Sequence, residues 1–198
     1  MITRGKVNDA IRALAAKRSA TVVDSDSSTA HLIFDVLQGF ASFLRIPEME
    51  NIFSAVGGQS VASYAPGLGN YIYLCEADCA SAERKLAVAV GMFVHIDQIN
   101  SLGAGQQVID YLGSGDLRAK YTCDARAAQA YVMWLLTGEV PFDLQTVFVP
   151  ILTDKEKEFA NGYYTLLLQK IETGELPIKA AQEAHTWLRE HAAGELKV

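Results

Sequence analysis

The strongest constraint on the fold is an apolar stretch in the middle of the chain. Residues 86–96 are apolar except for Gly91 and His95, and Ser81 and Glu83 before them are typical of a helix start. A helix that is apolar on all sides is usually covered by neighbours all round. The stretch therefore predicts a buried central helix. It is too short to cross a bilayer, which takes about 18 apolar residues or more, so we expect no membrane span.

Helix signals recur on both sides of this stretch. Thr3 can cap a first helix, and Val7, Ile11 and Leu14 have the spacing of one apolar face, with an end expected near Ser19. Further helices are expected at 29–45, 47–56, around 108–112, and at 116–137, 153–173 and 177–193. The most specific of these signals is the capping box Thr153-Asp-Lys-Glu156.

Two short segments have the character of strands. Residues 70–75 alternate aromatic and aliphatic side chains, and residues 144–149 lie in an extended segment between Pro141 and Pro150. We therefore predict a mainly α fold, a single-domain bundle of about seven or eight helices with one or two short strands near 70–75 and 144–149. A length of 198 residues fits one domain spanning residues 1–198.

The charge of the chain is unevenly distributed. The net charge is −6, but residues 1–18 contribute +4, which leaves −10 for the remainder. The basic residues of this N-terminal helix are our candidate partner-binding residues: Arg4, Lys6, Arg12, Lys17 and Arg18. A basic helix on an acidic body can dock on the acidic surface of a neighbouring copy, bind nucleic acid or anionic lipid, or remain solvated. Its apolar stripe favours packing against protein, so nucleic acid is the less favoured partner.

Cysteine and histidine spacing gives little support for a metal site. Cys75, Cys79 and Cys123, with His95 as a fourth ligand, would satisfy zinc chemically but lack paired CxxC spacing. The four histidines include no pair spaced i, i+4. We expect reduced thiols of a protein that is not secreted, and no metal-binding residue.

Other constellations do not point to a reaction. The glycine clusters lack the lysine and hydroxyl of a phosphate-binding loop and the spaced glycines of a dinucleotide site. We predict no catalytic residue, no cofactor and no cofactor-binding residue. An enzyme with a scattered site around His95, Cys123 or the acids between 76 and 83 remains an alternative.

One family resemblance accompanies this interpretation. Residues 57–95 resemble in outline the ImmA/IrrE-type metallopeptidases, in which a glycine-bearing strand leads through an arginine-containing turn into the zinc-binding helix. Residues 127–136 resemble the later helix of that family, which ends in a paired leucine. Where the family has its HExxH helix, this chain has Val90-Gly-Met-Phe-Val94, and Ala127 stands at the third ligand. The resemblance implies a relative that has no zinc-bound water to activate.

The favoured function is that of a non-catalytic structural or assembly subunit in a multi-protein complex, for instance a viral particle. Its partners would be copies of itself or other subunits, and its location the cytoplasm or a virion. The first alternative is a regulatory binding module, built on a degenerate ImmA/IrrE-like scaffold. The second is the enzyme with an unrecognised site.

Overall fold

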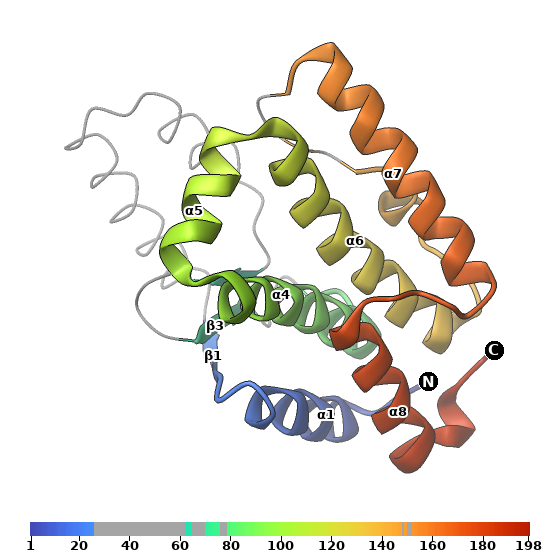
Figure 1. Ribbon diagram of the computed structural model, residues 1–198. Helices are drawn as coiled ribbons and strands as arrows, with labels where there is room; N and C mark the ends of the chain where they lie inside the picture. The colour runs from blue at the N-terminus through green and yellow to red at the C-terminus, as the bar shows by residue number, and fades with distance from the viewer. Residues whose placement is uncertain (26–61, 65–69, 76–78, 148, 150–151) are drawn as a thin grey trace.

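The structure is a computed structural model that describes residues 1–25, 62–64, 70–75, 79–147, 149 and 152–198. These residues form six α-helices, two 3-10 helices and three strands. Figure 1 shows the helices arranged around α4 and α6, with the strands to one side. The predicted mainly α class is confirmed. The helices expected at 29–45 and 47–56 lie outside the described residues.

The central helix α4 (Ala82–Leu102) coincides with the predicted apolar stretch. Ser81 caps it by accepting a hydrogen bond from the backbone N–H of Arg84 at 3.1 Å. Leu86, Val90 and Phe93 are fully buried. Helices α1, α5, α6 and α8 and the strands β2 and β3 all contact α4. Burial from every side explains why the sequence there is apolar all round.

Helix α1 (Arg4–Ala16) begins at the expected cap. The Thr3 side chain accepts a hydrogen bond from the backbone N–H of Lys6 at 3.4 Å. The helix ends slightly before the position expected, and Ser19 adopts a left-handed backbone conformation with φ of 48°. This turn leads directly into the first strand.

The three strands form one small sheet in the order β1-β3-β2. Strand β1 (Thr21–Ser25) pairs in parallel with β3 (Tyr71–Cys75), and β2 (Ala62–Tyr64) pairs antiparallel with β3. The strand predicted near 70–75 is therefore present, whereas β1 and β2 were not predicted. Ile72 and Leu74 of β3 are fully buried, which joins the sheet to the helical core.

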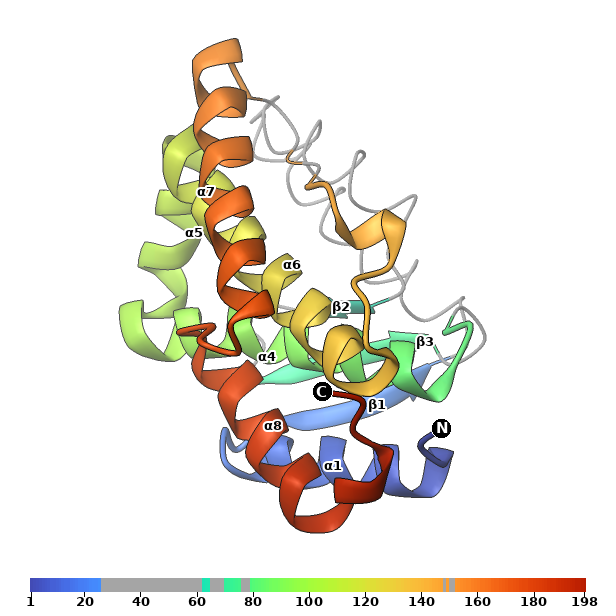
Figure 2. The same cartoon turned by 90° about the vertical axis from the view of Figure 1, so that its right-hand side faces the viewer.

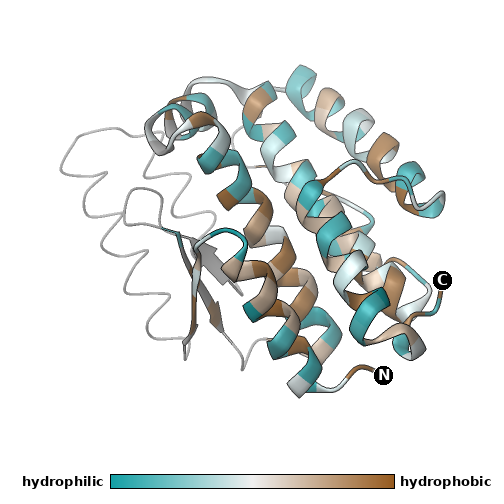
Figure 3. Ribbon diagram, turned by 60° about the horizontal axis from the view of Figure 1, so that its bottom comes forward, coloured by the Kyte–Doolittle hydropathy of each residue, from teal (hydrophilic) through white to brown (hydrophobic). Residues whose placement is uncertain are grey.

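The remaining helices follow in chain order. They are α5 (Ala104–Gly113), α6 (Gly115–Thr137), α7 (Asp154–Glu172) and α8 (Lys179–His191), with η1 (Phe142–Leu144) and η2 (Ala193–Glu195). Helix α6 packs between α4 and α7, and α8 contacts α1, α4 and α6. In Figure 3 the helices carry both hydrophobic and hydrophilic residues, as expected for helices that bury one side.

The strand predicted near 144–149 is wrong for the described residues of that segment. Phe142–Leu144 is the 3-10 helix η1, and residues 145–147 and 149 have no strand pairing. Leu144 is fully buried, so this segment follows the surface of α6 and does not join the sheet.

No single helix in the described part of the chain is long and apolar enough to cross a membrane. Helix α4 and residues 105–111 reach the length and apolar character of a membrane span only when taken together, and the chain bends by 111° between them.

Candidate functional site

The basic segment predicted to meet a partner divides into an accessible part and a buried part. Four of its residues have accessible side chains on α1 or just beside it: Arg4, Lys6, Arg12 and Lys17. Within the chain, Arg12 donates a hydrogen bond to the Asp9 carboxylate at 2.7 Å, and the Lys6 ammonium lies 3.6 Å from Glu195. These four residues are here together called the α1 basic face; around the helix Arg4 and Arg12 lie on one side of the exposed Asp9, and Lys6 and Lys17 lie on the other.

Arg18, the fifth predicted contact residue, is buried at 4% exposure. Its guanidinium donates to Asp97 of α4 at 2.7 Å, lies 2.8 Å from Glu183 of α8, and donates to the Leu14 carbonyl at 3.1 Å. The same group stands over the Phe93 ring, 5.2 Å from its centroid. Arg18 therefore joins α1, α4 and α8 and is not part of the α1 basic face, because its charge is used inside the molecule.

The apolar stripe of α1 is also used inside the molecule. Val7, Ile11 and Leu14 are all buried, and α1 contacts α4 and α8 of its own chain. The expectation that this stripe packs against a partner is corrected, since its apolar area is already covered. The side of α1 that remains accessible to a partner carries the α1 basic face together with the exposed Asp9.

The cysteines whose side chains are described, Cys79 and Cys123, are buried thiols. Burial raises the pKa of Cys123 to about 12, and the neighbouring Asp124 carboxylate adds to this shift. The Cys123 thiol donates to the Ala160 carbonyl at 3.6 Å. A thiol with this pKa holds its proton at neutral pH, which is the opposite of what a nucleophile or metal ligand needs.

His95 is half-buried on α4. Burial lowers its pKa, and its Nδ1 lies 3.0 Å from Oε1 of Gln98. Of the acids considered for catalysis, Glu76 and Asp78 lie outside the described residues, whereas Glu83 is buried on α4. Among the described side chains, no group of three or more His, Cys, Asp or Glu residues is placed to hold a metal ion.

The positions that would correspond to the zinc ligands in the metallopeptidase resemblance lie where α4 packs against α6. Val90, Val94 and Ala127 are all buried at 4% exposure or less. A Cβ atom on Gly91 would lie 2.5 Å from Nε2 of Gln129, so the glycine permits close contact with that side chain. Apolar side chains and close packing therefore occupy this part of the helix interface.

Several large apolar side chains remain exposed on well-formed elements. Away from the chain ends they are Leu102, Ile109, Phe142, Phe159 and Leu166. Phe142 is the most exposed of these at 85%, and Ile109 follows at 64%. Single exposed apolar residues are ordinary, but an aromatic side chain that is almost fully exposed suits a protein contact.

The turn that carries Phe142 is held firmly in place. The Asp143 carboxylate is paired with Arg84 of α4, and the Asp143 carbonyl accepts from Arg126 of α6. The Leu144 carbonyl accepts a hydrogen bond from the Tyr164 hydroxyl of α7 at 2.6 Å. Three helices thus fix the backbone beside Phe142 while its ring points into solvent.

A cavity of about 420 Å³, here called the interhelix pocket, opens between α4, α6, α7 and α8. Its apolar lining comes from Val94, Leu167, Pro177 and Ile178.

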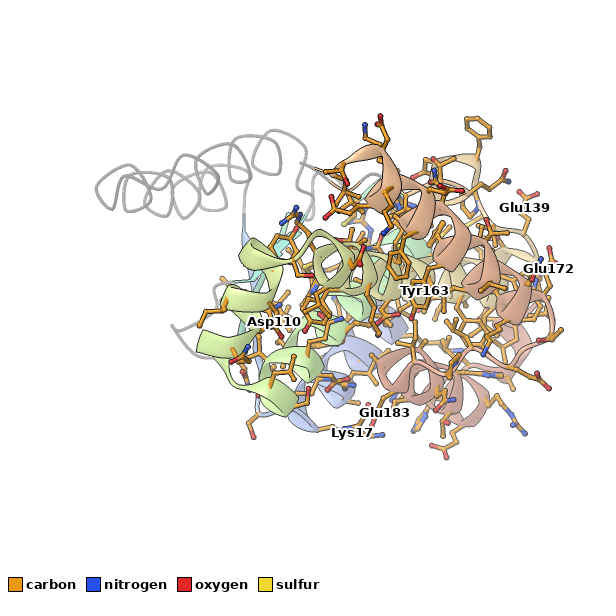
Figure 4. All side chains as sticks on the ribbon, turned by 45° about the horizontal axis from the view of Figure 1, so that its top comes forward. Lys17, Asp110, Glu139, Tyr163, Glu172 and Glu183 are labelled. Atoms are coloured by element: carbon orange, nitrogen blue, oxygen red, sulfur yellow. The ribbon has the colours of Figure 1, made fainter. Side chains whose placement is uncertain are left out.

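The polar side of the interhelix pocket is a small network. The Asp124 carboxylate accepts from Lys120 and from the Tyr163 hydroxyl, each at 2.7 Å. Tyr163 points from α7 toward α6, as Figure 4 shows, and its ring stacks on Phe159 with centroids 5.9 Å apart. Burial, with this hydrogen bond, raises the pKa of Tyr163. Lys179 also lines the pocket and is exposed.

No protein-family profile matches the sequence, and neither a curated protein nor a solved structure matches it. The family resemblance therefore rests on the residues quoted for it alone.

Sequence reasoning missed both Phe142 and the interhelix pocket. Phe142 lies in a segment expected to be extended, and its neighbour Pro141 was the only local signal of a turn. The pocket residues come from four helices, so no sequence spacing brings them together.

Proposed function

We propose that this chain is a non-catalytic assembly subunit that works through protein–protein contacts. The observation that supports this most is the almost fully exposed Phe142 on a turn that three helices hold in place. An aromatic side chain on a backbone that is fixed before binding leaves less to be ordered on association, and aromatic residues often contribute most of the affinity of an interface.

The surroundings of the candidate chemical groups also favour a non-catalytic role. Burial raises the pKa of the Cys123 thiol and lowers the pKa of His95, which favours the uncharged form of each. Val90, Val94 and Ala127 carry no ligand atoms and are packed between helices. The candidate groups that the structure describes are thus used for packing.

The α1 basic face would supply a second contact that depends on salt. Its charges lie on an otherwise acidic chain, so a natural partner is the acidic surface of another copy or of another subunit. A multi-copy complex in the cytoplasm or in a viral particle would be a suitable setting.

The absolute mass of the full-length protein, measured by light scattering at low and high salt, tests this function. A defined oligomer supports assembly from copies of this chain, and its dissociation at high salt implicates the α1 basic face. A strict monomer at both salt concentrations contradicts assembly from copies. Capture of a partner from a lysate would then favour the regulatory binding module.

A regulatory binding module is the second candidate. The observation in its favour is the order of elements, in which β3 leads into α4 and α6 packs across α4. This order accords with the outline of the metallopeptidase resemblance. Such a module would bind through the α1 basic face, and reversing Arg4, Arg12 and Lys17 to Glu should abolish binding. Unchanged affinity of that triple variant would exclude this route.

A further inference from the structure

Two arginine side chains from different helices meet at the turn that carries Phe142. Figure 2 shows the connection between α6 and α7, which carries η1, returning from the end of α6 toward the start of α7. The carboxylate of Asp143 in this turn is paired with Arg84 of α4, and its carbonyl accepts a hydrogen bond from Arg126 of α6. Both guanidiniums are therefore held beside the same residue.

The charges at this point do not cancel. The Asp143 carboxylate neutralises one guanidinium, whereas Arg126 receives only a carbonyl. In the described part of the chain, neither arginine forms an ion pair with Glu83, which is buried next to Arg84 in sequence, or with Glu139, which is exposed before the turn. Two guanidiniums with one carboxylate leave a local positive charge on a chain whose net charge is −6.

The pKa of Arg126 is consistent with an incomplete neutralisation. Burial lowers this pKa, and the positive charge of Arg84 lowers it further, whereas Tyr164 and Asp143 raise it. A guanidinium nevertheless stays protonated at neutral pH. Arg126 is thus a half-buried cation beside a second cation, and a bound anion would stabilise both.

The N–H groups that Asp143 leaves unused are open to solvent. The Arg84 side chain is 21% exposed and Arg126 is half-buried, and among the described side chains neither arginine has a buried nitrogen that lacks a partner. Phe142, next to Asp143, is 85% exposed. Guanidiniums bind phosphate through parallel N–H···O hydrogen bonds, and an aromatic ring offers a flat apolar surface to the group that carries the phosphate.

We propose that Arg84 and Arg126 bind the phosphate group of a phosphate monoester, and that Phe142 packs against the apolar part of that molecule. A phosphate dianion can bridge two guanidiniums, whereas the single carboxylate of Asp143 neutralises only one. The Asp143 carboxylate holds Arg84 in place, but its charge also opposes the charge of the ligand. This site goes beyond the proposed assembly function and does not depend on it.

Titration of the full chain with inorganic phosphate and with phenyl phosphate tests the site. Binding would be followed by NMR chemical shifts at pH 7.5 and constant ionic strength. Arg126→Gln removes the guanidinium, and Arg126→Lys keeps the positive charge. Arg12→Gln is the matched control, because it makes the same change in net charge at an exposed arginine of α1 that is also paired with an aspartate, Asp9. Circular dichroism would check that each variant is folded.

We expect saturable binding of both probes to the wild type and to Arg12→Gln. Arg126→Gln should weaken phosphate binding at least about tenfold, and Arg126→Lys should weaken it less. Asp143→Asn keeps the carbonyl that Arg126 binds but removes the opposing charge, so phosphate should bind about threefold more tightly. Phe142→Ala should weaken the binding of phenyl phosphate about threefold and leave that of inorganic phosphate unchanged.

Several outcomes would overturn the proposal. A wild type that shows no saturable phosphate binding, or that binds phosphate no better than Arg126→Gln does, has no such site. Acetate that binds as tightly as phosphate overturns the assignment to a phosphate group, and weaker phosphate binding to Asp143→Asn contradicts an anion site here. Equal affinity of phenyl phosphate for the wild type and Phe142→Ala overturns the role of the ring. The assembly function is tested by the mass of the protein without these probes, so either proposal can fail while the other stands.

Discussion

Removal of the Arg18 side chain should destabilise the protein far more than removal of its neighbour Lys17. Arg18 is 4% exposed and neutralises Asp97 and Glu183, whose side chains are each 21% exposed. Arg18→Ala would remove the cation that both carboxylates share. It would also remove the contact with the Phe93 ring and the hydrogen bond to the Leu14 carbonyl.

The size of the effect follows from this geometry. Breaking a buried ion pair by removing one partner costs about 3–5 kcal/mol. Because Asp97 and Glu183 retain some contact with water, we expect a loss near the lower end, about 3 kcal/mol of unfolding free energy. Lys17→Ala changes an exposed side chain and should stay within about 0.5 kcal/mol of the wild type.

Urea unfolding followed by circular dichroism measures this difference. With a slope of about 2 kcal/mol per molar urea, the Arg18→Ala midpoint should fall by roughly 1.5 M. A triple variant with Arg18→Met, Asp97→Asn and Glu183→Gln should recover much of the loss, since it removes the unpaired charges as well. Equal urea midpoints for Arg18→Ala and Lys17→Ala would refute the buried ion-pair network, because Arg18 would then contribute no more than an exposed charge does.

Three further results are expected. Burial lowers the pKa of both His95 and His185 below their ordinary value of 6.5, so the unfolded chain binds more protons. The free energy of unfolding should therefore decrease as the pH falls from 7.5 to 5.5, and it should decrease less in the variant His185→Gln. A free energy of unfolding that does not change over this pH range would contradict the burial of the two histidines. The pKa of Cys123 near 12 predicts that this thiol resists alkylation at pH 8 until urea unfolds the chain, as mass spectrometry of the peptide would report. A Cβ on Gly115 would lie 1.9 Å from Oε1 of Glu156, whereas one on Gly113 would meet nothing within 4 Å. Gly115→Ala should therefore unfold at lower urea than Gly113→Ala. When Glu156→Ala is added to each variant, this difference should disappear. Equal midpoints of the two glycine variants with Glu156 present would disprove the contact.

The parts of the fold that sequence predicted are those with a local cause. The capping box of Thr153 and Glu156 forms as expected at the start of α7, because all its hydrogen bonds lie within four residues. The apolar stretch of α4 and the strand β3 were likewise predicted from the residues of these elements themselves. Strand β1 is short and pairs in parallel with residues about fifty positions later, so its partner has no local signal.

The candidate site was harder to predict for the same reason. Arg18 counted as a surface charge because its partners, Asp97 and Glu183, lie on α4 and α8 far along the chain. Phe142 lies between Pro141 and a pattern that suggested a strand, and its exposure depends on contacts that fix the turn from three helices. The sequence does identify α1 as basic, but only tertiary packing decides which of its charges reach solvent.

The sheet order β1-β3-β2 has a consequence for synthesis of the protein. Strand β1 can pair only after β3 has been made, and the packing around α1 is complete only when α8 supplies Glu183 to Arg18. Until then, α4 can cover Val7, Ile11 and Leu14 only in part, because α8 is the second helix that packs on α1. Within this chain, α1 and β1 are thus made before the elements that complete their packing, and their apolar residues are open to non-native contacts in the interval.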